Sequence, residues 1–229
     1  MTARRSLLTL LAAALVAASL VGCMAPAQPA SRTESPTASP TSTPAQVTAV
    51  AIGDSIAIGN GVPAEDAWPL LVADRLGWTL TDFGESAAGF TVKGLNTHTF
   101  DDQVSATIRL RPDVVIVAAT RNDLFASTAS LRTAATAALE RLRSALPEAR
   151  IIGVGAIWGS DAAPAQIALI SSTVKAAVLG VGGSWIEVGQ PFAGRPDLVL
   201  ADHVHPTVEG QRLLASTISA AISRRLVIG

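Results

Sequence analysis

From residue 47 to the carboxyl terminus, short apolar runs alternate with longer segments whose apolar residues recur at helical spacing. The runs are rich in β-branched residues, which is typical of strands buried on both faces of a sheet. They predict strands at residues 47–52, 78–83, 114–118, 151–157 and 184–188. The predicted helices are residues 64–76, 100–110, 127–146 and 163–179, and a last helix capped by Thr207.

This alternation predicts a parallel sheet covered by helices on both faces. About 180 residues are few for an eightfold β/α barrel. We therefore expect one α/β domain, a three-layer α/β/α sandwich with a mainly parallel central sheet. In open α/β sheets the functional side chains gather at the carboxyl ends of the strands.

The first residues of the chain have the pattern of an export signal. Arg4 and Arg5 precede an apolar stretch at residues 7–20 that is too short to span a bilayer comfortably. The stretch ends in Leu20-Val21-Gly22-Cys23, which resembles the bacterial lipobox, in which the cysteine is lipidated and becomes the mature N-terminus. Cys23 is the only cysteine, so it has no internal disulfide partner. An uncleaved anchor or a chance cysteine is the alternative.

Residues 24–46 are rich in Pro, Ser, Thr and Ala and lack the large apolar residues that would offset the entropy of ordering. They predict a tether that lifts the domain off a membrane. We therefore divide the chain into a signal peptide at 1–22, a lipidated Cys23 with its tether at 23–46, and a domain at 47–229. The expected location is extracytoplasmic, lipid-anchored to the cell membrane.

Charge limits the classes of partner. The chain has 17 Lys and Arg, 18 Asp and Glu, and a net charge of −1, with no Lys/Arg-rich stripe. This composition argues against binding of nucleic acid. We expect a monomer whose partner is the membrane, through the lipid anchor.

Three residues at the two ends of the domain point to acyl transfer. Gly53-Asp54-Ser55 leaves the first predicted strand, which places Ser55 at the carboxyl edge of the sheet. Asp202 and His205 lie three residues apart on a polar loop that ends at Pro206. A serine, a histidine that takes its proton and an aspartate that orients the histidine form a catalytic triad.

His203 is two residues from His205, and alternate residues of an extended loop point to opposite sides. His205 is therefore the predicted base. The alternative is that Asp202, His203 and His205 bind a metal. His98 is the only other histidine, and no further cluster of ligands supports a metal site, so we expect neither a metal nor another cofactor.

An oxyanion also needs hydrogen-bond donors. Asn122 follows the predicted strand 114–118 and offers a side-chain amide, and the small-residue turn at 84–89 offers backbone N–H groups at the same edge. Asp54 and Asp123 are expected to brace their own loops. Trp158 follows the strand 151–157 and either lines the substrate pocket or packs in the core.

Together these motifs resemble the SGNH (GDSL-type) hydrolase superfamily, over nearly all of residues 47–229. The resemblance implies a flavodoxin-like SGNH hydrolase fold and ester hydrolysis through an acyl-enzyme, without a metal. It implies Ser55, Asp202 and His205 as catalytic residues, and an oxyanion hole made by Ser55, Asn122 and a second-block glycine. That glycine aligns with Ala87, or with Gly89 if the turn shifts, and Ala87 is the predicted donor.

A further departure from the family is Thr120, which stands where a glycine is usual and is expected to narrow the site. The leading function is a serine esterase tethered at the cell surface, and its expected substrate partner is a small-molecule or glycan-borne ester. One alternative is an acyltransferase or deacetylase that uses the same triad on cell-envelope glycans. Another is a binding lipoprotein with an inactive triad.

Overall fold

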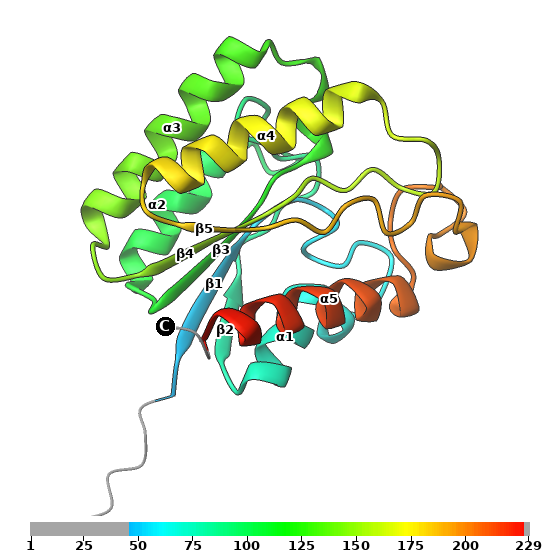
Figure 1. Cartoon of the computed structure of the whole chain (residues 1–229), viewed down its shortest axis with the longest axis horizontal. Coiled ribbons are helices and arrows are strands. Elements are labelled where there is room, and N and C mark those ends of the chain that lie inside the picture. The colour runs from blue at the N-terminus through cyan, green and yellow to red at the C-terminus, as the bar shows by residue number, and fades with distance from the viewer. Residues whose placement is uncertain (1–45, 227–229) are drawn as a thin grey trace, which may run out of the picture. The chain divides into compact units, whose positions relative to one another are not determined.

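The computed structural model describes residues 46–226 (Figure 1). Five strands form one parallel sheet in the order β2-β1-β3-β4-β5. They are β1 Thr48–Ile52, β2 Thr79–Asp82, β3 Val114–Ala118, β4 Arg150–Val154 and β5 Ser184–Ile186. Every strand that the structure describes therefore ends at the same edge of the sheet, where Ser55 follows β1.

Helices cover both faces of the sheet, which confirms the predicted three-layer sandwich (Figure 1). One face carries α1 Trp68–Leu76 and α5 Val208–Leu226, which pack on each other. The other face carries α2 Phe100–Leu110, α3 Thr128–Ala145 and α4 Ala165–Gly180. Three short 3₁₀ helices complete the described part: η1 Ala64–Asp66, η2 Arg121–Phe125 and η3 Pro196–Leu198.

The central strands are buried on both faces because successive side chains point to opposite sides of the sheet. In β3, Val115 and Val117 pack into the core under α2, α3 and α4. Val114 and Ile116 pack into the second core, under α1 and α5. This arrangement explains why β3 has an uninterrupted β-branched run instead of an alternating one.

Two predicted elements differ most in extent from the structure. The helix expected at 64–76 is divided, because Ala67 is extended with φ −62° and ψ 135°, and α1 begins only at Trp68. The strand expected at 151–157 ends at Val154. Its apolar run continues because Ala156 and Ile157 are buried in the loop beyond the sheet.

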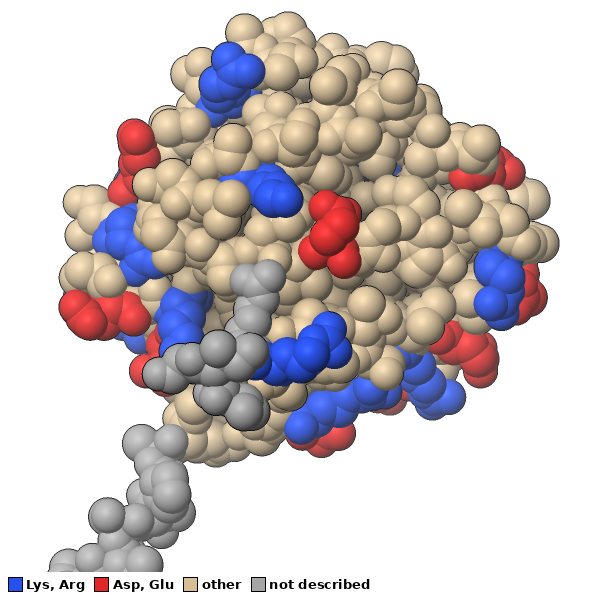
Figure 2. Space-filling model, in the orientation of Figure 1, with Lys and Arg blue, Asp and Glu red and all other residues tan. Residues whose placement is uncertain are grey.

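The signal peptide at 1–22, Cys23 and almost all of the tether at 23–46 lie outside the described residues. None of the helices within 46–226 is long and apolar enough to cross a bilayer. On the face of the molecule shown in Figure 2, acidic and basic side chains are interspersed and separated by uncharged surface.

Candidate active site

The turn that carries Ser55 is held by two buried glutamines. Gln103 of α2 accepts a hydrogen bond from the Gly53 N–H at 2.9 Å and donates one to the Gly53 carbonyl at 3.0 Å. Gln211 of α5 donates to the Ile56 carbonyl at 3.1 Å. The turn is thereby fixed from both faces of the sheet. The sequence analysis did not identify either residue. The only signal in the sequence is a glutamine on the mostly apolar face of each helix.

Ser55, His205 and Asp202 form a continuous hydrogen-bonded chain. The Oγ of Ser55 lies 2.9 Å from Nε2 of His205, and Nδ1 of the same ring lies 2.6 Å from Oδ2 of Asp202. The carboxylate fixes the tautomer that carries its proton on Nδ1 and leaves Nε2 as the acceptor. The structure thus assembles, from residues 150 positions apart, the arrangement that removes a proton from a serine.

Asp202 is fixed by its own loop. Its Oδ1 accepts hydrogen bonds from the N–H groups of Val204 and His205, at 2.9 and 3.0 Å. Partial burial alone would raise the pKa of Asp202, but the hydrogen bond with the His205 ring and these two backbone donors outweigh it and lower the pKa to about 2. The carboxylate therefore stays ionised at any pH at which the histidine acts as a base.

His203 does not join this chain. Its Nδ1 lies 3.2 Å from the hydroxyl oxygen of Ser160, and its carbonyl accepts a hydrogen bond from the Ser160 N–H. A side chain at Gly159 would collide with that carbonyl, since a Cβ there would lie 2.2 Å from it. Within residues 46–226, no group of three or more His, Cys, Asp or Glu side chains is placed to hold a metal.

The geometry separates the two candidates for the backbone oxyanion donor. The Gly89 N–H already donates to the Val92 carbonyl at 3.0 Å. The Ala87 N–H meets no protein acceptor in the described part of the chain. Ala87 also has φ 65°, in the left-handed region that favours glycine. This backbone angle explains why the family has a glycine at the position. The N–H without a protein acceptor makes Ala87 the available donor.

Asn122 lies at the start of η2, after β3. Its Nδ2 donates to the Ala88 carbonyl at 2.9 Å, which ties the amide to the turn that holds Ala87. An Asn amide has two N–H groups, so the second stays available for a substrate oxygen. Asn122 and Ala87 are therefore held side by side as potential donors.

Thr120 has a role different from the one expected. Its residue is 1% exposed, so it does not narrow the opening of the site. Its hydroxyl donates to Oδ2 of Asp54 at 2.5 Å and accepts the N–H of Asn122 at 3.0 Å. Thr120 therefore connects the turn of the serine to the loop of Asn122, a contact that glycine cannot make.

Asp54 braces its own turn, as expected, whereas Asp123 acts on a distant segment. Asp54 accepts the Ile56 N–H at 2.9 Å, and its burial raises its pKa despite the hydrogen bonds from Thr120 and Ile56. Asp123 accepts from the N–H of Phe90, and from both the N–H and the hydroxyl of Thr91. Its side chain thus holds the segment after the Ala87 turn, whereas our prediction placed its effect on the loop into α3.

Trp158 is only partly buried, and the next residue, Gly159, lies against the His203 carbonyl of the triad loop. The guanidinium of Arg121 lies 3.7 Å above its ring and also donates to the Trp158 carbonyl. Such stacking fixes a long side chain that would otherwise be mobile. Trp68 and Trp185 are core residues.

These residues correspond to a known family. A family model described as "GDSL-like Lipase/Acylhydrolase family" matches residues 51–213, which include Ser55, Asn122, Asp202 and His205. The chain belongs to this family. It is a serine hydrolase that acts on ester bonds.

Individual relatives agree with this assignment. A GDSL lipase of Mycobacterium tuberculosis is 24% identical over 188 residues, which cover 77% of this chain and 81% of the relative. The esterase EstA of Pseudoalteromonas sp. has the same fold, with a TM-score of 0.66 at 17% identity over 79% of this chain and 99% of that one. Est24, a carbohydrate acetylesterase from Sinorhizobium meliloti, gives a TM-score of 0.63 at 15% identity over 78% and 99%.

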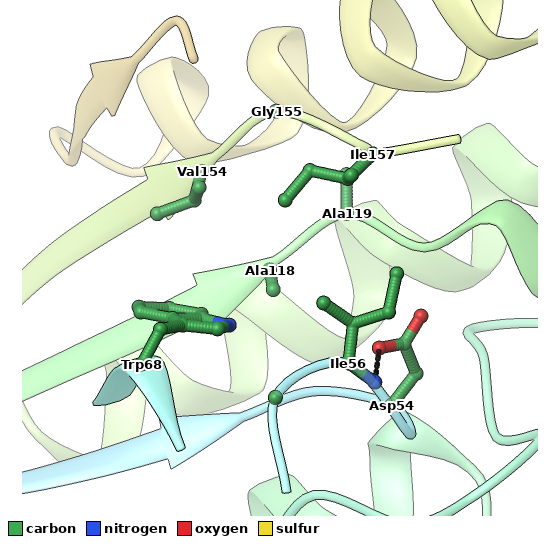
Figure 3. Close-up of a pocket in the computed structure, with 9 residues that line it drawn as sticks. Asp54, Ile56, Trp68, Ala118, Ala119, Val154, Gly155 and Ile157 are labelled. Atoms are coloured by element: carbon green, nitrogen blue, oxygen red, sulfur yellow. Dashed lines mark hydrogen bonds between the residues drawn. The ribbon is translucent and has the colours of Figure 1, made fainter. Parts of the chain in front are cut away.

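The turn that carries Ser55 rests on a tightly packed interior. A cavity of about 10 Å³ lies behind it, lined by Asp54, Ile56 and mostly apolar residues from α1, β3 and the end of β4 (Figure 3). Figure 3 shows Trp68 on one side of this cavity and Ile157 on the other. The cavity has the volume of about one water molecule, so no substrate group fits behind the turn.

A second buried carboxyl lies near this turn, at the end of β2. Oδ1 of Asp82 accepts the Gly84 N–H at 2.8 Å, while its Oδ2 is buried and has no hydrogen-bond partner among the described residues. Burial, together with the negative charge of Asp54, raises the pKa of Asp82 to about 6. Because the folded protein then binds this proton more tightly than the unfolded chain does, the stability falls as pH rises from about 4 to 6.

We expect Asp82→Asn to be more stable than the wild type at pH 8 and not at pH 4. A shift from 3.8 to about 6 corresponds to at most about 3 kcal/mol, less the cost of an unpaired amide. Urea titrations at the two pH values measure the difference. Asp113→Asn is the matched control with the opposite sign, because hydrogen bonds from Thr48 lower the pKa of Asp113. An equal change at both pH values for Asp82→Asn would contradict the ionisation argument.

Proposed function

We propose that this enzyme cleaves esters through a covalent acyl-enzyme on Ser55. The observation that carries the proposal is the chain of short contacts from Ser55 through His205 to Asp202, at 2.9 and 2.6 Å. Oγ attacks the ester carbonyl while Nε2 takes its proton, and the imidazolium is stabilised by Asp202. The alcohol then leaves with that proton, and the acyl group stays on Oγ.

The negative oxygen formed in each attack needs preorganised donors. We assign this role to the N–H groups of Ser55 and Ala87 and to the side-chain amide of Asn122. The support is that Ala87 and Asn122 are tied to the same turn, and that both backbone N–H groups lack protein acceptors in the described part of the chain. Water then attacks the acyl-enzyme by the same route in reverse and releases the acid.

For the substrate, we propose acetyl or other short acyl esters carried by glycans of the cell envelope. The Sinorhizobium relative is described as a carbohydrate acetylesterase, which favours the same class. Transfer of the acyl group to an acceptor alcohol uses the same acyl-enzyme, and it differs only in what replaces the leaving alcohol.

A substrate panel tests this proposal. We expect turnover of p-nitrophenyl esters to fall steeply beyond short chains, and acetate to be released from acetylated polysaccharides. Formation of an acetylated acceptor instead of free acetate would assign the transferase alternative. Failure to release any acyl group, together with no labelling of Ser55 by a fluorophosphonate, would contradict the proposal and favour the inactive binding lipoprotein.

We further propose that the enzyme is anchored outside the cytoplasmic membrane through a lipid on Cys23. The Pro-, Ser- and Thr-rich sequence of residues 24–46 would serve as the tether between Cys23 and the domain. These residues join the domain at β1, whose first residue Thr48 is at the amino edge of the parallel sheet. Ser55 is at the opposite, carboxyl edge. The anchor therefore attaches to the domain on the side away from the triad, which suits a substrate beyond the bilayer.

Replacing Cys23 with serine is expected to release the protein from the membrane or to block its maturation, because serine lacks the thiol that is lipidated. Detergent partitioning and N-terminal sequencing of the mature protein measure the two effects. Turnover of small soluble esters should not change, since Cys23 supplies no group to the proposed mechanism. A mutant that stays membrane-bound with the same unprocessed N-terminus as the wild type would show that the apolar stretch at 7–20 is the anchor.

A further inference from the structure

A second side chain, besides that of Ser55, lies at the reacting nitrogen of the histidine. Nδ2 of Asn60 is 3.4 Å from Nε2 of His205, the atom that also lies 2.9 Å from Oγ of Ser55. With its proton on Nδ1, the neutral ring has a single acceptor site at Nε2. The serine makes the shorter contact and occupies that site. The Asn60 amide keeps most of its hydrogen-bonding capacity and lies beside the point where the proton moves.

The backbone fixes Asn60 in this place. Its N–H donates to the Ser55 carbonyl at 2.9 Å, and the flanking Gly59 and Gly61 have φ of 70° and 87°. A Cβ on Gly61 would lie 2.4 Å from the Leu200 side chain, and the Leu200 N–H donates to the His205 carbonyl at 2.7 Å. The segment is therefore packed against the histidine loop, and only glycine permits that approach.

Asn60 is exposed, so molecules that enter from solvent can reach its amide. During the reaction, two oxygen atoms must come in turn within hydrogen-bond distance of Nε2 of His205. In acylation, the leaving alcohol takes a proton from Nε2 as its bond to the carbonyl carbon breaks. In deacylation, a water oxygen bonds to that carbon and gives its proton to Nε2, which returns it to Ser55 Oγ as the acyl–Oγ bond breaks.

We propose that the Asn60 amide donates a hydrogen bond to the oxygen atom that exchanges a proton with Nε2. This oxygen belongs first to the leaving alcohol and then to the attacking water. This role deepens the proposed function and rests on it. It gives Asn60 control over the alcohol side of the substrate, because the amide contacts the oxygen of the leaving group and not the acyl group.

Two esters with the same acyl group separate this role from a structural one. Ethyl acetate releases an alkoxide that must be protonated as it leaves, whereas p-nitrophenyl acetate releases a phenolate that departs without a proton. We expect Asn60→Ala to lower kcat/KM for ethyl acetate about tenfold, as for the loss of one hydrogen bond. For p-nitrophenyl acetate we expect a change of less than about twofold, because acylation there does not use the contact.

Asn96→Ala is the matched control, since Asn96 is exposed on the loop after the Ala87 turn. It should change neither value. An equal loss on both esters in Asn60→Ala would overturn the proposal, because it would show that Asn60 only holds His205 in place. No loss on either ester would also overturn it. If the wild type hydrolysed neither ester, the proposed function itself would fail and this role would fall with it.

Discussion

Ser55→Ala is expected to lose ester hydrolysis by on the order of 10⁴- to 10⁶-fold in kcat, without unfolding. The side chain is the only hydroxyl within hydrogen-bond distance of Nε2 of His205 in the described part of the chain. The residual rate would come from binding and from the oxyanion donors alone. The fold should persist because Gln103 and Gln211 hold the turn through backbone atoms of Gly53 and Ile56.

The measurements are turnover of p-nitrophenyl acetate and labelling by a fluorophosphonate, with thermal unfolding as the check on folding. Ser172→Ala is the matched control, since its exposed hydroxyl on α4 bonds only to the Leu169 carbonyl. It should behave as wild type in all three assays. Turnover close to wild type in Ser55→Ala would show that Ser55 is not the nucleophile.

The two histidines of the loop after η3 are expected to differ sharply. His205→Ala should reduce kcat about as much as Ser55→Ala, because the triad acts as a unit and its removals are not additive. His203→Ala should keep most activity, since its ring contacts the hydroxyl of Ser160 and not the serine of the turn. The double variant Ser55→Ala with His205→Ala should be no slower than either single variant.

The same variants distinguish the triad from the metal alternative. A metal site would make His203 and His205 equally necessary, and zinc would restore activity to a chelated enzyme. In the structure, the His203 ring faces Ser160 while the His205 ring faces Ser55, and this separation leads us to expect unequal damage. Equal damage with rescue by zinc would contradict the acyl-enzyme mechanism.

The sequence alone determined the layers of the fold and the identity of the triad candidates. Continuous β-branched runs such as 114–118 have one stable placement, in a sheet buried on both faces, and the intervening helical periods place helices over it. Ser55, Asp202 and His205 were readable because each belongs to a short motif at a predicted turn or loop. Local sequence was sufficient there, since strand direction alone places such turns at one edge.

Only the tertiary structure decided how the site is held. Gln103, Thr120 and Gln211 reach the serine turn across 50, 66 and 155 positions of the chain, and such contacts depend on which strands are neighbours. No local pattern specifies that order. Thr120 is an example. From the sequence, a threonine in place of a glycine predicts a narrower site, but in the structure its hydroxyl is buried and bonded to Asp54.

The choice of oxyanion donor and the position of Asn60 were also decided only by the tertiary structure. The sequence favoured Ala87 but left Gly89 open. The structure separates them, because the Gly89 N–H is bonded to Val92 and the Ala87 N–H has no protein acceptor in the described residues. Asn60 reads as an ordinary turn residue until two left-handed glycines bring it beside His205. Sequence periodicity records which face of an element is buried, whereas hydrogen-bond partners far apart in the chain are set by packing.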